Sequence, residues 1–119
     1  MSESDLTGVG VGPVLQSTPL AAALAAAIEG ENDRVIVRDE GAYLRVLSPR
    51  ICRLSRATIE ATTGSPFRFP GDLEVVMSSF SGLVQMNEHG AVWWLATDPV
   101  PDPPRSPPQS PPQTQPADR

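Results

Sequence analysis

The chain has 119 residues, a formal net charge of −5 and no lysine among its nine basic residues, a balance that argues against a nucleic-acid partner. Its one cysteine, Cys52, excludes an intrachain disulfide and a multi-cysteine metal site, and it favours a cytoplasmic location. No apolar run approaches the ~20 residues that cross a bilayer, and no basic region precedes the first apolar stretch, so neither a membrane span nor a signal peptide is expected.

The first elements predicted are a strand and a helix. Residues 9–16 are apolar and β-leaning, with glycines and a proline that favour an irregular or edge strand. The hydroxyl of Ser17 or Thr18 can then cap a helix over residues 18–29. The spacing of its larger apolar residues predicts one core-facing stripe, made of Leu20, Leu24 and Ile28.

A β-hairpin and a second helix are predicted next. The hairpin joins strands over residues 35–38 and 43–47 through a turn that contains glycine. Residues 50–54 follow as a short extended piece. Ser55 is then a suitable N-cap for a helix over residues 56–63, which a glycine ends.

The last elements are predicted to be three strands, over residues 73–78, 83–86 and 91–95. Small polar residues around Phe80 interrupt the chain between the first two, over residues 78–82. The resulting order is β-α-β-β-α-β-β-β. It predicts an α+β fold in one small domain, with two helices packed on a mostly antiparallel sheet.

Both ends of the chain look unlike this domain. Nine of the 14 prolines fall within residues 98–119, a segment without Leu, Ile, Met or aromatic residues. It cannot bury enough apolar surface to offset the entropy of ordering, so we expect a disordered proline-rich tail there. Residues 1–8 are expected to form a flexible N-terminal tail, which leaves residues 9–97 as the domain.

Few residues in this sequence could support catalysis. His89 is the only histidine, and it falls in a predicted hairpin turn, where solvated histidines are the common case. Cys52 stands between Arg50 and Arg53, which could lower the thiol pKa, although a buried apolar role is the more common one. One histidine and one cysteine cannot build a zinc tetrahedron. A small enzyme or ligand-binding domain that uses Cys52 or His89 is the alternative to a protein that acts by binding a partner.

Three stretches stand in a recognisable order, D-E-G-A-Y-L-R-V at residues 39–46, S-S-F-S-G at 78–82 and W-W-L at 93–95. With their spacing, they resemble the coupling (effector or regulatory) proteins of bacterial multicomponent diiron monooxygenases. That family contains the methane monooxygenase regulatory protein and the phenol and toluene monooxygenase effectors. The resemblance covers about residues 9–96, and the proline-rich tail departs from it.

The resemblance implies a cofactor-free protein, a monomer when free, that binds the hydroxylase component and is not a catalyst by itself. Such proteins tune oxygen activation, coupling and the regioselectivity of hydrocarbon oxidation. The sequence does not specify whether the parent system oxidises an alkene, arene, phenol or alkane, because the substrate pocket belongs to the hydroxylase. Carried over by position, the expected partner-binding residues are Ser78, Ser79, Phe80, Ser81 and Gly82, with Tyr43 and Arg45 on the hairpin.

Overall fold

The computed structural model describes residues 10–105, so the predictions for residues 1–8 and for most of the proline-rich tail lie outside the described residues. Three helices are present in this part of the chain, α2 (Pro19–Glu31), α3 (Arg56–Thr63) and α4 (Gly71–Val76). The strands are β1 (Gly12–Gln16), β2 (Ile36–Asp39), β3 (Tyr43–Leu47), β4 (Ile51–Ser55), β5 (Met77–Ser81), β6 (Leu83–Asn87) and β7 (Gly90–Trp94).

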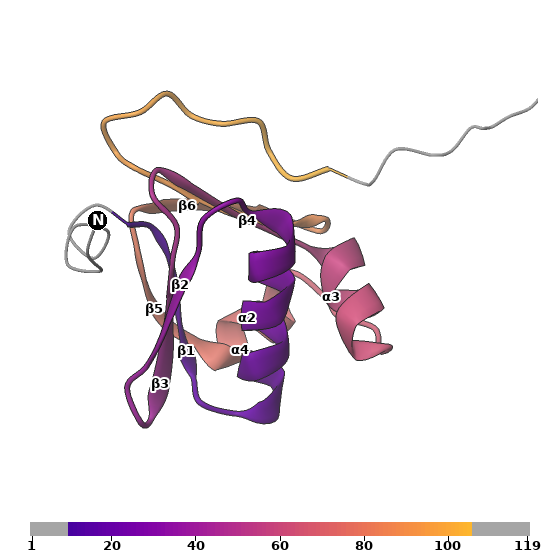
Figure 1. The fold of residues 1–119 in the computed structure, drawn as a ribbon. Helices are drawn as coiled ribbons and strands as arrows, with labels where there is room; N and C mark the ends of the chain where they lie inside the picture. The colour runs from indigo at the N-terminus through magenta and orange to yellow at the C-terminus, as the bar shows by residue number, and fades with distance from the viewer. Residues whose placement is uncertain (1–9, 106–119) are drawn as a thin grey trace, which may run out of the picture.

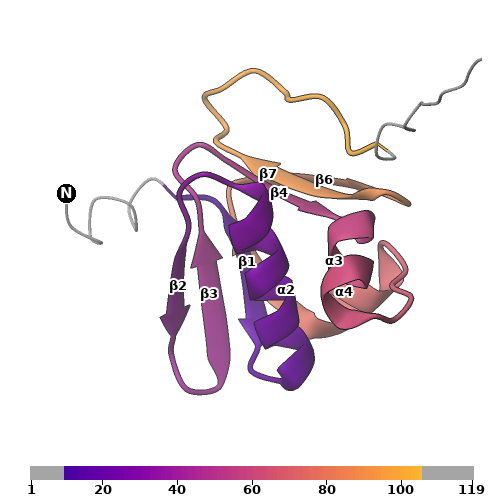
Figure 2. The same cartoon turned by 45° about the vertical axis from the view of Figure 1, so that its right-hand side comes forward.

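The strands form two sheets, and every pairing between them is antiparallel. One sheet has four strands in the order β2-β3-β1-β5, and the other has three in the order β4-β7-β6. Helix α2 covers one face of the four-stranded sheet, and the three-stranded sheet lies across its end (Figures 1 and 2). The predicted α+β class is confirmed, with a third helix and a second sheet that the sequence did not indicate.

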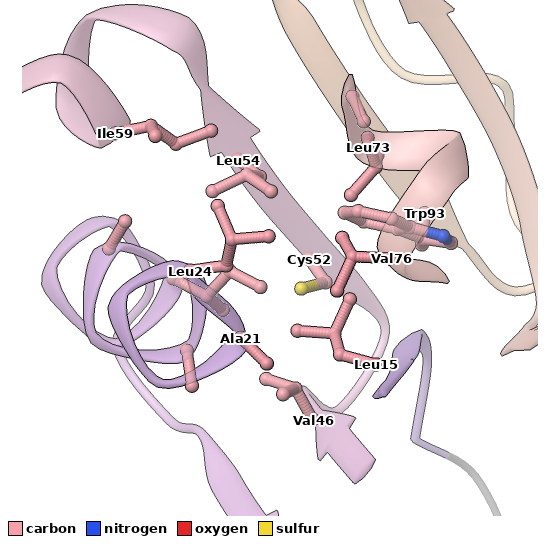
Figure 3. Packing of buried hydrophobic residues seen from close by; sticks show 14 of the residues in the cluster. Leu15, Ala21, Leu24, Val46, Cys52, Leu54, Ile59, Leu73, Val76 and Trp93 are labelled. Carbon is pink, nitrogen blue, oxygen red and sulfur yellow. The ribbon is translucent and has the colours of Figure 1, made fainter. Parts of the chain in front are cut away.

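The core lies between α2, the two sheets and α4. Figure 3 shows Leu15 and Val46 from the four-stranded sheet facing Leu24 of α2. Trp93 reaches the same cluster from the three-stranded sheet, and Cys52 lies near its middle. A single apolar cluster therefore joins the two sheets into one domain.

Strand β1 is central in its sheet, so the edge alternative of the prediction is wrong, whereas the irregular one agrees with the register shift between Val14 and Leu15. It lies between β3 and β5, and Gly12 is the residue that permits this position. A Cβ atom at Gly12 would lie 2.1 Å from the carbonyl oxygen of Val46. The glycine that suggested an irregular edge is therefore required by close packing at the centre of the sheet.

Helix α2 begins as expected but presents a different face to the core. The Thr18 hydroxyl accepts a hydrogen bond from the Ala21 amide at 3.0 Å, and the helix continues through Gly30 to Glu31. The prediction that Leu20 faces the core is wrong, since its side chain is 37% exposed. The buried residues are Ala21, Leu24, Ala25, Ala27 and Ile28.

The strand predicted over residues 73–78 is wrong for residues 73–76, and only its last two residues belong to a strand, β5. Residues 71–76 form helix α4, whose Leu73 and Val76 are buried while Val75 is 79% exposed. This spacing of three suits a helical turn, whereas a strand would have buried alternate residues. The polar segment predicted as an interruption is instead strand β5, which pairs with β1.

The first part of the predicted tail contacts the domain. Residues 98–105 are described, and Pro104 is buried. The Asn87 side chain donates a hydrogen bond to the Pro104 carbonyl oxygen at 2.7 Å. The domain limit at residue 97 stays a prediction, but these contacts argue for a later one.

Within residues 10–105, no helix is both long and apolar enough to span a bilayer.

Candidate partner-binding surface

Strand β5 stands at the edge of the four-stranded sheet and carries four of the five residues expected in its segment. Its Ser78, Ser79 and Phe80 are all exposed. The pairing shifts by one residue here, because Met77 lies opposite Leu15 while Ser79 lies opposite Val14. Ser78 is therefore the extra residue of a β-bulge, a feature common where an edge strand serves a function.

Two predicted residues from distant segments share one face of this sheet. Arg45 on β3 and Ser79 on β5 both lie opposite Val14 on β1, so the three form one row. Residues that are directly opposite on neighbouring strands point to the same side of a sheet. This side is the one away from α2, because Leu15 and Val46, the alternate residues, belong to the core cluster. Two strand spacings of about 4.8 Å separate Arg45 from Ser79.

Tyr43 extends this surface by one row. It lies opposite Gln16 on β1, and its ring is 42% exposed. Since Tyr43 and Arg45 are two residues apart on β3, they point to the same side. The exposed surface that the structure assembles is thus made of Tyr43, Arg45, Gln16 and Ser79.

Phe80 and Gly82 lie differently from these residues. Phe80 is opposite Pro13, hence on the other side of the sheet from Ser79, and is exposed because β5 is an edge strand. Gly82 is the corner between the two sheets, with φ +90°, and a Cβ atom there would lie 2.6 Å from the Trp94 carbonyl oxygen. Gly82 is therefore explained by folding, whereas Phe80 is available at the edge.

A charged cluster borders the surface and was not singled out from the sequence. Glu40 forms ion pairs with both Arg45 and Arg38, with carboxylate oxygens 3.5 Å from Nε of Arg45 and 3.9 Å from Nε of Arg38. Arg38 and Arg45 are directly opposite each other on β2 and β3. The sequence showed Glu40 only as an ordinary turn residue, and the register of the hairpin is what places it between two arginines.

The two residues of the enzyme alternative are poorly placed for catalysis. Burial raises the pKa of the Cys52 thiol to about 12, which contradicts activation by Arg50 and Arg53. His89 lies in the turn between β6 and β7, next to Glu88, whose carboxylate is 3.4 Å from its Nε2. Among the described residues, no three His, Cys, Asp or Glu side chains gather as a metal site would need.

Comparison with known proteins shows similarity in both sequence and fold. The model of the MmoB/DmpM family matches residues 10–94. An alkene monooxygenase system effector subunit from Xanthobacter autotrophicus (strain ATCC BAA-1158 / Py2) is 36% identical over 86 residues, which are 71% of this chain and 84% of that protein.

Two solved structures share the fold. Both describe a complex of phenol hydroxylase with its regulatory protein. The first matching chain has a TM-score of 0.64 at 18% identity and covers 71% of this chain and 95% of its own. The second has a TM-score of 0.61 at 22% identity and covers 71% of this chain and 99% of its own.

Proposed function

Because the chain belongs to the MmoB/DmpM family, we propose that it is the effector component of a multicomponent monooxygenase and acts by binding the hydroxylase component. The observation that carries this proposal is the 36% identity to an alkene monooxygenase effector subunit over 84% of that protein. The fold shared with the regulatory protein of phenol hydroxylase supports it.

The protein is a regulatory component and not the catalytic one. Its effect on the hydroxylase has to come from binding one state of that partner more tightly than another. We place it in the cytoplasm, in keeping with its single buried thiol. The name of the Xanthobacter relative makes small alkenes the first substrates to test.

We assign the contact with the hydroxylase to the β5 edge and the adjoining sheet face. The edge offers Ser78 and Phe80 on a strand with one side unpaired among the described strands. The face offers Tyr43, Arg45 and Ser79 in neighbouring rows. An exposed aromatic ring and an arginine are typical of residues that anchor protein interfaces.

Reconstituted turnover tests the function directly. Hydroxylase and reductase from the parent system are assayed on a small alkene while this protein is titrated. Turnover should rise to an optimum near a stoichiometric ratio to the hydroxylase, and the Cys52→Ala and His89→Ala variants should support the same optimum. A turnover that does not change on addition of the protein would refute the proposal.

Two charge variants test the location of the interface. Ser79→Asp combined with Phe80→Ala should weaken binding to the hydroxylase at least about tenfold, which corresponds to ~1.4 kcal/mol. The control is Ala26→Asp, which adds the same charge at an exposed position on α2, in the opposite layer. Both variants should keep the parent circular dichroism spectrum. Equal loss of affinity in the two variants would place the contact elsewhere.

A further inference from the structure

The outer face of the three-stranded sheet is covered, although none of the helices within residues 10–105 lies on it. Ala91 and Trp93 of β7 point into the core cluster, so Val92 and Trp94 point the other way. Yet Val92 is fully buried and Trp94 is only 7% exposed. The segment of residues 98–105 returns over this face and lies above β6 and β7 in both views (Figures 1 and 2).

Polar contacts tie this segment to the sheet from one end to the other. Asp98 forms an ion pair with Arg50, just before β4. Farther along, the Asp102 carbonyl oxygen lies 3.4 Å from the Arg53 guanidinium, and the Pro104 carbonyl oxygen accepts from Asn87. Arg53 is opposite Val92, and Asn87 is opposite Gly90. The segment therefore runs antiparallel to β7.

Between these anchors, apolar residues of the segment and of the sheet line a common hollow. Residues 99–101, of sequence Pro-Val-Pro, line one side of a hollow of about 480 Å³, and Ile51 and Trp94 line the other. At the far end, the ring of Pro104 is buried. The Pro-Val-Pro stretch thus faces Trp94 across the hollow, and Pro104 is the proline that is buried over the sheet.

The chemistry of these contacts is that of polyproline recognition. A segment rich in proline has few backbone N–H groups but outward carbonyl groups, and it loses little entropy on binding. Surfaces that bind such segments combine an aromatic ring with side-chain donors for the carbonyl groups. Trp94 is the ring here, and Arg53 and Asn87 are the donors.

We propose that the outer face of the β4–β7–β6 sheet is a polyproline-binding surface and that residues 98–105 are its intramolecular ligand. The match to the family model ends at residue 94, so this ligand lies outside the part of the chain that the family shares. A proline-rich peptide should bind this surface in place of residues 98–105 when substitutions weaken the contacts of that segment.

Nuclear magnetic resonance of the full chain, labelled with nitrogen-15, tests whether the segment covers Trp94. The loosened variant, with Asp98→Ala and Pro104→Gly, removes the ion pair at one end of the segment and the buried proline ring at the other. We expect the Trp94 indole signal to move while the Trp93 signal, from the core, stays in place. The matched control carries Asp118→Ala and Pro108→Gly, the same changes beyond residue 105, and should leave both signals at their parent positions.

Addition of a peptide with the sequence of residues 97–106 tests the ligand class. It should return the Trp94 signal of the loosened variant toward its parent position in a saturable way and should not affect the parent. Adding Asn87→Ala to the loosened variant should weaken this binding about fivefold, as expected for one lost hydrogen bond.

Three results would overturn the proposal. One is a Trp94 signal that does not differ between the loosened variant and the parent. Another is a signal that moves but does not respond to the peptide. The third is an equal response to a peptide in which alanine replaces every proline. A Trp93 signal that also moves would mean that the double variant disturbs the core. The single variant Asp98→Ala, which removes only the ion pair with Arg50, is then titrated with the same peptide, and its Trp94 signal gives the test.

Discussion

Two glycines, Gly82 and Gly30, differ in whether the structure leaves room for a side chain. Gly82 has φ +90° and no room for a Cβ atom, which would lie 2.6 Å from the Trp94 carbonyl oxygen. Gly30 lies in α2, and a Cβ atom there would meet nothing within 4 Å. We expect Gly82→Ala to lower the free energy of unfolding by about 2–4 kcal/mol, and Gly30→Ala to raise it by about 0.5–1 kcal/mol. Urea denaturation measures both, and equal effects would contradict the close approach at Gly82.

Cys52 gives the protein an alkaline limit to its stability. Burial raises the thiol pKa from 9.0 to about 12, so between these values the unfolded chain loses a proton that the folded protein keeps. The contribution of the protonated thiol to the free energy of unfolding is therefore complete below pH 9 and is lost as the pH rises toward 12. Relative to Cys52→Ala, the parent should lose about 1.4 kcal/mol of unfolding free energy between about pH 8 and about pH 10. Parallel pH profiles of the two proteins would show that the thiol ionises normally.

At the scale of elements, the end of α2 is fixed to β4 by its last residues. The Glu31 carboxylate accepts from the Ser55 amide at 2.6 Å and from the Ser55 hydroxyl at 2.7 Å. The Asn32 side chain exchanges two hydrogen bonds with the Arg53 backbone, at 2.9 and 3.0 Å. These contacts join the helix of the four-stranded layer to a strand of the other sheet, so they fix the angle between the layers.

Glu31→Ala should therefore destabilise the domain by about 2 kcal/mol, because it removes two charge-assisted hydrogen bonds. Glu29→Ala is the matched control, since Glu29 lies on the same helix and is exposed. It should change the unfolding free energy by less than about 0.5 kcal/mol. Thermal or urea unfolding that does not separate the two variants would contradict a fixing role for Glu31.

For the molecule as a whole, the contacts of residues 98–105 argue for a domain limit later than residue 97. Residues 98–105 cover Val92 and Trp94, whereas residues 106–119 keep the composition of a segment that cannot build a core. A chain that ends at residue 105 should have the unfolding temperature and hydroxylase activation of the full chain. A fall of more than a few degrees in that temperature would show that residues 106–119 also contribute.

Much of the architecture was predictable because local sequence patterns specify it. The first helix, the hairpin and the last two strands follow from capping residues, turns and alternation. The change from α4 to β5 within residues 71–81 was not predictable. The six residues of α4 are too few to distinguish a helical from an extended apolar pattern. There the packing of Leu73 and Val76 against the core decided between helix and strand.

The candidate surface shows the same division. The residue types of the site could be seen in the chain alone: small hydroxyl residues around Phe80, a hairpin with Tyr43 and Arg45, and no catalytic array. Tertiary packing alone sets β1 between β3 and β5, which places Ser79 in one row with Arg45. It also decided that part of the proline-rich segment covers a sheet. Pairing between distant strands depends on which apolar faces bury each other, and no local pattern in the chain records that choice.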